Sequence, residues 1–214
     1  SSTALPENLV FPYGENDENL KLSSFSAKPY LHSLKGFLDP AGHFALAACS
    51  LLKKAIEERQ EEKVTPGGTT GIAALTQYGA GGAAFTFFSQ LVQKGPRLAS
   101  PLIFPHSYAS TAPNLAAIEF GWNGPHTIYF GKQDCREILE FAAARLAEES
   151  AQKMVVLVYE AVPPELLPEK RNIRNGALAL LLEKAPERSA RLRFTLPQLR
   201  ALQPAICEAG SVQG

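Results

Sequence analysis

Cysteine and histidine are the residue types in this chain best suited to act as a nucleophile and as a proton carrier. The chain contains Cys49, Cys135 and Cys207, and its histidines are His32, His43, His106 and His126. Cys135 is the strongest candidate, because Lys132 and Arg136 lie beside it and a helix is expected to begin there. Positive surroundings of this kind lower the pKa of a thiol. Nucleophilic catalysis by Cys135 is therefore one hypothesis, although no histidine follows it in the sequence.

The pattern of cysteines and glycines gives no sign of a metal ion or cofactor. The three cysteines are odd in number, widely spaced and without a Cys-x-x-Cys pair, so we expect reduced thiols, with neither a disulfide framework nor a zinc site. The cluster of Gly79, Gly81 and Gly82 lacks the Gly-Lys-Ser/Thr ending of a phosphate loop and the spacing of a dinucleotide fingerprint. A tight turn after a strand explains these glycines better.

Composition favours one globular unit. The chain has 214 residues, of which 45% are hydrophobic and 20% charged, and 21 basic residues balance 21 acidic ones. A chain of this size can bury a substantial core. Its balanced charge gives no overall attraction to nucleic acid. No apolar run is long enough for a membrane span, and the first 20 residues lack the pattern of a signal peptide, so we expect a cytoplasmic protein.

Helical and strand-like segments alternate along the chain. Asp39 is a plausible helix cap, Pro40 suits the first helical position, and apolar residues then recur at helical spacing as far as Ile56. We expect further helices in the segment of Phe85 to Val92, from Pro113 to Phe120, and after a capping box formed by Asp134 and Glu137. Strands are expected at residues 69–76, 127–130, 154–159, 176–183 and 191–196.

A series of short motifs resembles the ketosynthase branch of the thiolase superfamily. In order, the motifs are Gly95-Pro96-Arg97, Ser100-Pro101, Pro113-Asn114, and Gly121-Trp122-Asn123-Gly124-Pro125, followed by a short strand. The resemblance covers about residues 25–196. It implies an α/β fold of the thiolase-like layered kind, with only the N-terminal half present and a mixed sheet between helices. We find no confident first strand in residues 1–38, and the second half of a ketosynthase, which supplies its catalytic histidines and lysine, is absent.

The nucleophile expected from the resemblance is missing. Counting from Pro125, the family's cysteine would fall eight residues later, where this chain has Gln133. A glutamine side chain cannot serve as the nucleophile that condensation requires. Glutamine at this position is similar to the pattern of chain length factors, the inactive partners of type II polyketide ketosynthases. The chain thus looks like a shortened chain length factor, similar to the half-length ketosynthase-like proteins of aryl polyene biosynthesis.

The resemblance implies protein partners and no cofactor. The partners would be an active β-ketoacyl synthase, in a heterodimer or a dimer of heterodimers, and an acyl carrier protein, in polyketide or fatty-acid-like synthesis. The strand before the elbow would form the interface, with residues Thr127, Ile128, Tyr129 and Phe130. Six apolar residues are expected to line the acyl pocket or, alternatively, to pack in the core: Phe85, Phe87, Phe88, Leu102, Ile103 and Phe104. Lys170, Arg171 and Arg174 are the densest basic cluster outside helices, and they are either a docking site for the acidic carrier protein or an ordinary solvated loop.

The expected organisation has three parts: an extended or partly ordered N-terminal segment at residues 1–25, a ketosynthase-like domain at residues 26–196, and a tail at residues 197–214. Three functions remain open. By resemblance, the chain is expected to be a catalytically silent subunit that shapes an acyl tunnel, an enzyme that uses Cys135 for acyl transfer or malonyl decarboxylation, or a purely structural stabiliser of a ketosynthase.

Overall fold

A mixed four-stranded sheet is the centre of the described part of the chain. The computed structural model describes residues 25–33, 36–57, 69–131, 135–161 and 175–184. The helices are α1 (Pro40–Glu57), α2 (Gly81–Lys94), α3 (Thr111–Phe120) and α4 (Arg136–Ala147), with 3-10 turns η2 (Lys28–Tyr30) and η3 (Phe104–Ser107). The strands are β1 (Thr70–Thr76), β2 (His126–Phe130), β3 (Lys153–Glu160) and β4 (Gly176–Glu183). The expected strand at residues 191–196 and most of both chain ends lie outside the described residues.

The strands are arranged in the order β2-β1-β3-β4. Strand β1 is parallel to both β2 and β3, with Ile72 opposite His126 on one side and Val155 on the other. Strand β4 is antiparallel to β3. The continuous apolar run of β3 is almost entirely buried, as expected for an inner strand that is covered on both faces.

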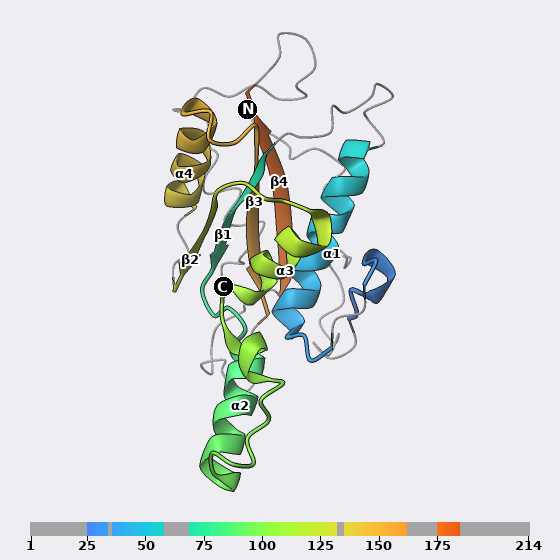
Figure 1. Cartoon of the computed structure of the whole chain (residues 1–214), viewed down its shortest axis with the longest axis vertical. Helices are drawn as coiled ribbons and strands as arrows, with labels where there is room; N and C mark the ends of the chain where they lie inside the picture. Colours follow the sequence, from blue (N-terminus) through green and yellow to red (C-terminus); the bar gives the residue numbers. More distant parts are fainter. Residues whose placement is uncertain (1–24, 34–35, 58–68, 132–134, 162–174, 185–214) are drawn as a thin grey trace, which may run out of the picture.

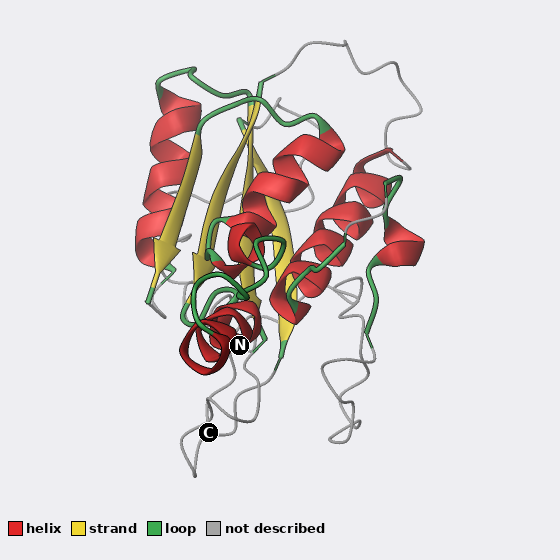
Figure 2. Ribbon diagram, turned by 60° about the horizontal axis from the view of Figure 1, so that its bottom comes forward, coloured by secondary structure: helices red, strands yellow, loops and turns green. Residues whose placement is uncertain are grey.

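Helices cover both faces of the sheet and produce three layers (Figures 1 and 2). On one face, α1 and α3 form a core with Ile72, Ala74 and Leu157. On the other face, α4 packs against Ala73 and Leu75. Successive residues of β1 therefore point to opposite cores, which is the two-residue period of a strand. This arrangement confirms the expected layered α/β fold with a mixed sheet between helices.

Two of the helix ends are where the sequence predicted them, and two differ from the prediction. Asp39 caps α1, since its Oδ1 accepts a hydrogen bond from the N–H of Ala41 at 2.8 Å, and Gly121 ends α3 in the left-handed conformation at φ 69°. Helix α3 begins at Thr111, two residues before Pro113, because a proline is tolerated where first-turn N–H groups lack helical partners. The residue at the N-cap of α4 is Cys135 and it makes no capping bond through its side chain, so the expectation that Asp134 is the cap was wrong.

A long excursion of the chain leaves the end of the sheet between β1 and α3. We call residues 81–108 the α2 arm, because helix α2 runs out and the segment containing η3 returns beside it (Figure 1). The rings of Phe87 and Phe104 lie 5.1 Å apart, and the N–H of Ser100 donates to Oε1 of Gln90 at 2.9 Å. These contacts join the outgoing and returning halves of the arm.

The described residues lack a strand near the start of the chain and a helix that could cross a membrane. Among residues 25–33 and 36–39 the structure contains the turn η2 and no strand. Within the described residues, none of the helices has the length and apolar character that crossing a bilayer would require.

Candidate functional site

The strands β1, β2 and β3 run in the same direction, so their C-terminal ends meet at one edge of the sheet. The turn into the α2 arm follows β1 at this edge, the connection to Cys135 follows β2, and Tyr159 and Glu160 end β3. Open α/β sheets generally place their functional groups at this edge. This edge of the sheet therefore brings the base of the α2 arm close to the end of β2 and to the last residues of β3, and we take it as the candidate functional site.

Cys135 is completely buried between β1 and α4. Its sulfur takes part in a disulfide bond, so the expectation of reduced thiols was wrong for this residue. Cys49, by contrast, is a free and buried thiol in α1, and burial raises its pKa. Neither sulfur is the exposed thiolate that a nucleophilic cysteine requires.

Two of the histidines are poorly placed to serve Cys135 as a proton carrier. His43 lies on α1, which covers the opposite face of the sheet, and its Nδ1 accepts a hydrogen bond from the N–H of Ala27 at 3.1 Å. His126 is at the start of β2, whereas Cys135 follows the end of that strand. Burial lowers the pKa of both imidazoles. The hypothesis of catalysis by Cys135 receives no support from either residue.

Strand β2 pairs with β1 along one side and, among the described residues, has no strand on its other side. Ile128 packs into the core under α1 and α3, and Tyr129 packs into the core under α4. Phe130, at the end of the strand, is 60% exposed. The expected interface at residues 127–130 is thus an edge strand with one exposed aromatic ring at its end.

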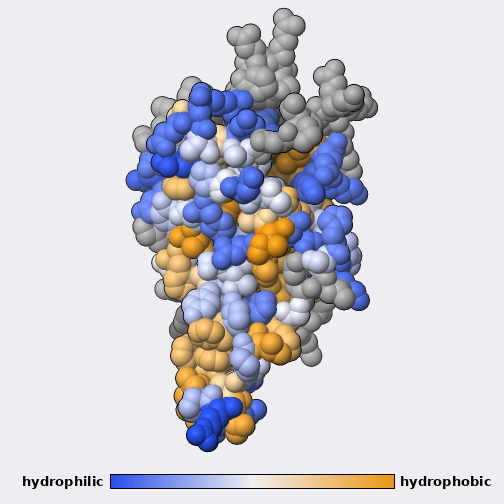
Figure 3. All heavy atoms as spheres, viewed as in Figure 1, coloured by the Kyte–Doolittle hydropathy of each residue, from blue (hydrophilic) through white to orange (hydrophobic). Residues whose placement is uncertain are grey.

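The six apolar residues expected to line a pocket all lie in the α2 arm. Four of them are between 44% and 60% exposed: Phe85, Phe88, Leu102 and Phe104. Val92 and Leu98 are exposed too, at 83% and 69%. Figure 3 shows the apolar colour gathered on the lower part of the molecule, where the arm projects. The alternative expectation, that this group packs in the core, does not hold for these four residues.

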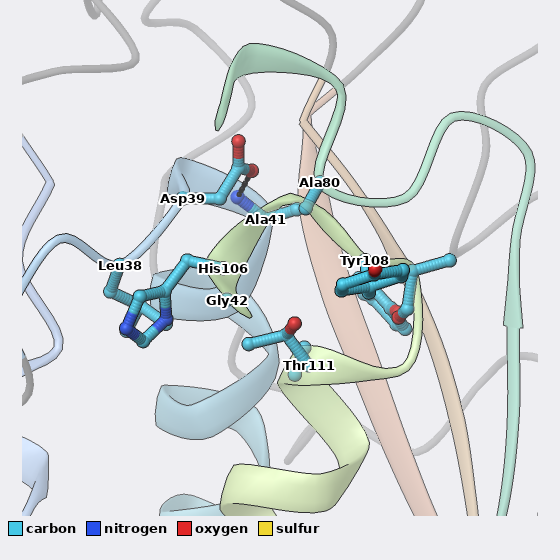
Figure 4. A pocket seen from close by; sticks show the side chains of 11 residues that line it. Leu38, Asp39, Ala41, Gly42, Ala80, His106, Tyr108 and Thr111 are labelled. Carbon is cyan, nitrogen blue, oxygen red and sulfur yellow. Dashed lines mark hydrogen bonds between the residues drawn. The ribbon is translucent and has the colours of Figure 1, made fainter. Parts of the chain in front are cut away.

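Two hollows lie near the base of the arm. The first is enclosed by Leu38, Ala80, Tyr108, Thr111 and their neighbours (Figure 4), and the packed side chains leave no space for a water molecule. The second is an open groove of about 360 Å³ beside the start of α3, lined by Phe104, Tyr108 and Asn114 among others. Neither is an enclosed acyl pocket.

A buried carboxylate at the end of β3 holds the turn that leads into the arm. Glu160 is only 3% exposed. Its Oε1 accepts hydrogen bonds from Oγ1 of Thr76 at 3.0 Å and from the N–H of Tyr78 at 3.2 Å, and its Oε2 accepts from the N–H of Gln77 at 2.8 Å. Burial raises the pKa of Glu160, although these hydrogen bonds counteract part of the effect.

A second buried carboxylate, Asp39, caps two helices at once. Its Oδ1 caps α1 as described, while its Oδ2 accepts a hydrogen bond from the N–H of Ala83 in the first turn of α2 at 2.7 Å. The N-cap residue of α2 is Ala80 (Figure 4), whose side chain cannot accept a hydrogen bond. Burial raises the pKa of Asp39 more than the backbone hydrogen bonds lower it.

Sequence reasoning identified Asp39 as a helix cap and did not identify Glu160. The signal for Glu160 was a single acidic residue that ends the apolar run of residues 154–159. The proposed nucleophile position Gln133 and the basic cluster of Lys170, Arg171 and Arg174 lie outside the described residues. The domain boundaries at residues 25, 196 and 197 fall at or beyond the limits of the described segments and stay predictions.

No family model and no curated protein sequence matches this chain. Solved structures do match. The ishigamide ketosynthase/chain length factor has a TM-score of 0.64 at 19% identity, over 78% of this chain and 50% of that chain. The complex AntDE:AntF, described as a type II PKS acyl-carrier protein with its ketosynthase bound to the hexaketide, has a TM-score of 0.62 at 18% identity, over 75% and 52%.

A third structure, the ketosynthase ApeO in complex with its chain length factor ApeC from Xenorhabdus doucetiae, has a TM-score of 0.51 at 15% identity, over 70% of this chain and 59% of that chain. This chain therefore spans between half and three fifths of the structures it matches. At these identities the comparisons establish the fold, which is the thiolase-like fold of ketosynthases and chain length factors.

Proposed function

We propose that this chain is a catalytically silent, chain length factor-like subunit that pairs with an active β-ketoacyl synthase and shapes its acyl tunnel in type II polyketide or fatty-acid-like synthesis. The observation that carries the proposal is the fold it shares with ketosynthase and chain length factor structures. The three structures described above each contain a ketosynthase, and two of them are named for a chain length factor.

Catalytic silence is supported by the sequence at the elbow and by the state of Cys135. Gln133 takes the place of the nucleophile in the motif alignment, and an amide does not supply the thiolate needed to carry an acyl chain. Cys135, two residues later, is buried and oxidised. A condensing activity would then have to come from the partner subunit.

Two exposed features support a protein partner. Strand β2 lies at the edge of the described sheet, and an edge strand is a common place for a strand of another chain to pair. The α2 arm exposes several aromatic and aliphatic side chains, and exposed apolar patches commonly mark interaction sites. The ring of Phe130 approaches the backbone at Gly79, where the arm begins. The end of β2 therefore lies beside the turn that leads into the arm.

The acyl tunnel would be completed at this surface. The tunnel lining would be Phe85, Phe87, Phe88, Leu102, Ile103 and Phe104 once the partner covers the arm, where four of these side chains are exposed in the described structure. An acidic acyl carrier protein would dock on Lys170, Arg171 and Arg174. Charge attraction of this kind guides association between complementary surfaces.

The first test is co-expression of this chain with an active β-ketoacyl synthase from the same genome, followed by native mass spectrometry. We expect a one-to-one heterodimer or a dimer of heterodimers. Phe130→Ser should weaken it, since burial of the ring on the partner would be lost. Ser150→Ala, at an exposed position between α4 and β3, is the control. A wild-type chain that stays alone or pairs only with itself would exclude the proposed function.

The second test separates tunnel shaping from simple stabilisation. Phe88→Ala removes an exposed ring from the arm and should lengthen the product of the reconstituted complex, whereas the surface change Ile118→Ala on α3 should leave product length unchanged. Unaltered product length for alanine variants at all six proposed lining positions would leave only a stabilising role.

Charge reversal at Lys170, Arg171 and Arg174 should abolish carrier-protein binding while the heterodimer stays intact.

A further inference from the structure

The base of the α2 arm is tied to the end of β3 by buried polar groups. Glu160 accepts three hydrogen bonds from residues 76–78, which form the outgoing side of the base. The adjacent Tyr159 donates its hydroxyl hydrogen to the carbonyl oxygen of Ala109, on the returning side. Two consecutive residues of one strand therefore hold both sides of the arm.

Asp39 adds a third connection from α1. Through its bond to the N–H of Ala83, it fixes the first turn of helix α2 itself. We call Asp39, Tyr159 and Glu160 the clasp. All three side chains are almost fully buried, at 4%, 1% and 3% exposure, and polar groups in such surroundings lose more when a hydrogen bond breaks than exposed ones do.

The two sides of the arm also touch at this point. Gly79 has a φ of 59°, and a Cβ atom added there would lie 2.8 Å from Cβ of Ala109 and 3.3 Å from the ring of Phe130. The N–H of Gly79 donates to Oγ1 of Thr76 at 2.9 Å. Because Oγ1 of Thr76 donates in turn to Glu160, the carboxylate controls the turn through a short chain of hydrogen bonds.

Beyond its base, the arm has few contacts with the rest of the described structure. The main contacts of α2 are with η3, inside the arm itself. Its direction relative to the sheet is consequently determined at the base, where the clasp lies. A small rotation there would displace Phe88 and Val92, far along the helix, by a larger distance.

We propose that Asp39, Tyr159 and Glu160 are positioning residues that fix the direction of the α2 arm and thereby the shape of the surface presented to a ketosynthase. The effect on a ketosynthase rests on the proposed function. The positioning of the arm rests only on the hydrogen bonds of the clasp. The clasp touches no substrate. It acts through the arm, so its loss should change what the arm contacts more than it changes the core.

The test compares Glu160→Gln and Tyr159→Phe with the control Val155→Ala. Both clasp variants keep the size of the side chain, whereas the control creates a cavity in the same strand at a residue with no part in the clasp. Amide hydrogen exchange is measured on the isolated chain. Residues 77–84 in Glu160→Gln, and residues 109–114 in Tyr159→Phe, should exchange about fivefold faster or more, the effect of losing one buried hydrogen bond, and α4 should be unchanged. The control should not show this local pattern.

Partner binding is then measured for the same variants with the co-expressed ketosynthase. We expect both clasp variants to lower affinity and broaden product length, and Val155→Ala to leave both unchanged in the folded protein. The proposal would be overturned if exchange were unchanged at residues 77–84 in Glu160→Gln and at residues 109–114 in Tyr159→Phe, or if affinity and product length were unchanged despite faster exchange. If the wild-type chain binds no ketosynthase, the proposed function fails, and the exchange data alone decide whether the clasp holds the arm.

Discussion

Replacement of Asp39 by asparagine should separate its two capping roles. The carboxylate accepts hydrogen bonds from the N–H of Ala41 through Oδ1 and from the N–H of Ala83 through Oδ2. An asparagine has only one oxygen, so one of these buried N–H groups would face an NH₂ group. A buried donor left without a partner costs about 1–3 kcal/mol, and the neutral amide regains part of this because no charge is buried. We expect a loss of about 1–2 kcal/mol.

Asp39→Ala should cost more than Asp39→Asn. Each lost cap is worth about 0.5–2 kcal/mol, so two lost caps give about 1–4 kcal/mol in total. The assay is urea unfolding followed by circular dichroism, with the slope of the transition used to confirm that the variants unfold the same structure. Hydrogen exchange should show faster opening of residues 81–84 in at least the alanine variant.

The matched control is Glu119→Gln. This carboxylate also accepts hydrogen bonds from two backbone N–H groups, those of His32 and Ser33, and one from Oγ of Ser33, but at an exposed site. Water replaces a lost partner there, and the change should cost less than about 0.5 kcal/mol, as at most surface sites. If Asp39→Asn and Asp39→Ala cost no more than this control, the reasoning that one buried carboxylate caps two helices is refuted.

Three further predictions concern pH, the core and the thiols. Burial raises the pKa of Glu160 above its ordinary value of 4.5, so its contribution to stability is present below that value and is lost as the pH rises; the stability of wild type relative to Glu160→Gln should fall with rising pH, and a constant difference from pH 4 to pH 8 in urea titrations would contradict this. Leu157→Ala should cost about 2–5 kcal/mol because the side chain is completely buried under α1, and a loss under about 1 kcal/mol would show that the central strand is not packed as described. In the native chain without reductant, iodoacetamide should label neither Cys135, which is oxidised, nor Cys49, which is buried; rapid labelling of Cys135 would revive the nucleophile hypothesis.

The sequence alone determined the elements and their order. The apolar period of residues 44–56, the run of residues 154–159 and the ending at Gly121 are local signals, and they located α1, β3 and the end of α3 to within a few residues. The order of motifs from Gly95 to Pro125 led to the thiolase-like fold, which the comparisons confirm. Local patterns suffice for these conclusions because helix and strand periodicity depends on neighbouring residues.

Only the tertiary structure decided which residues meet. Asp39 and Ala83 are 44 residues apart, and Glu160 and Thr76 are 84 apart. The side chains of Phe85 and Phe88 have the composition of a core, yet α2 leaves the sheet and exposes them. Burial and long-range hydrogen bonds depend on how the elements pack. The role of Glu160, a single acidic residue at the end of an apolar strand, therefore follows only from the tertiary structure, which places its carboxylate beside the base of the α2 arm.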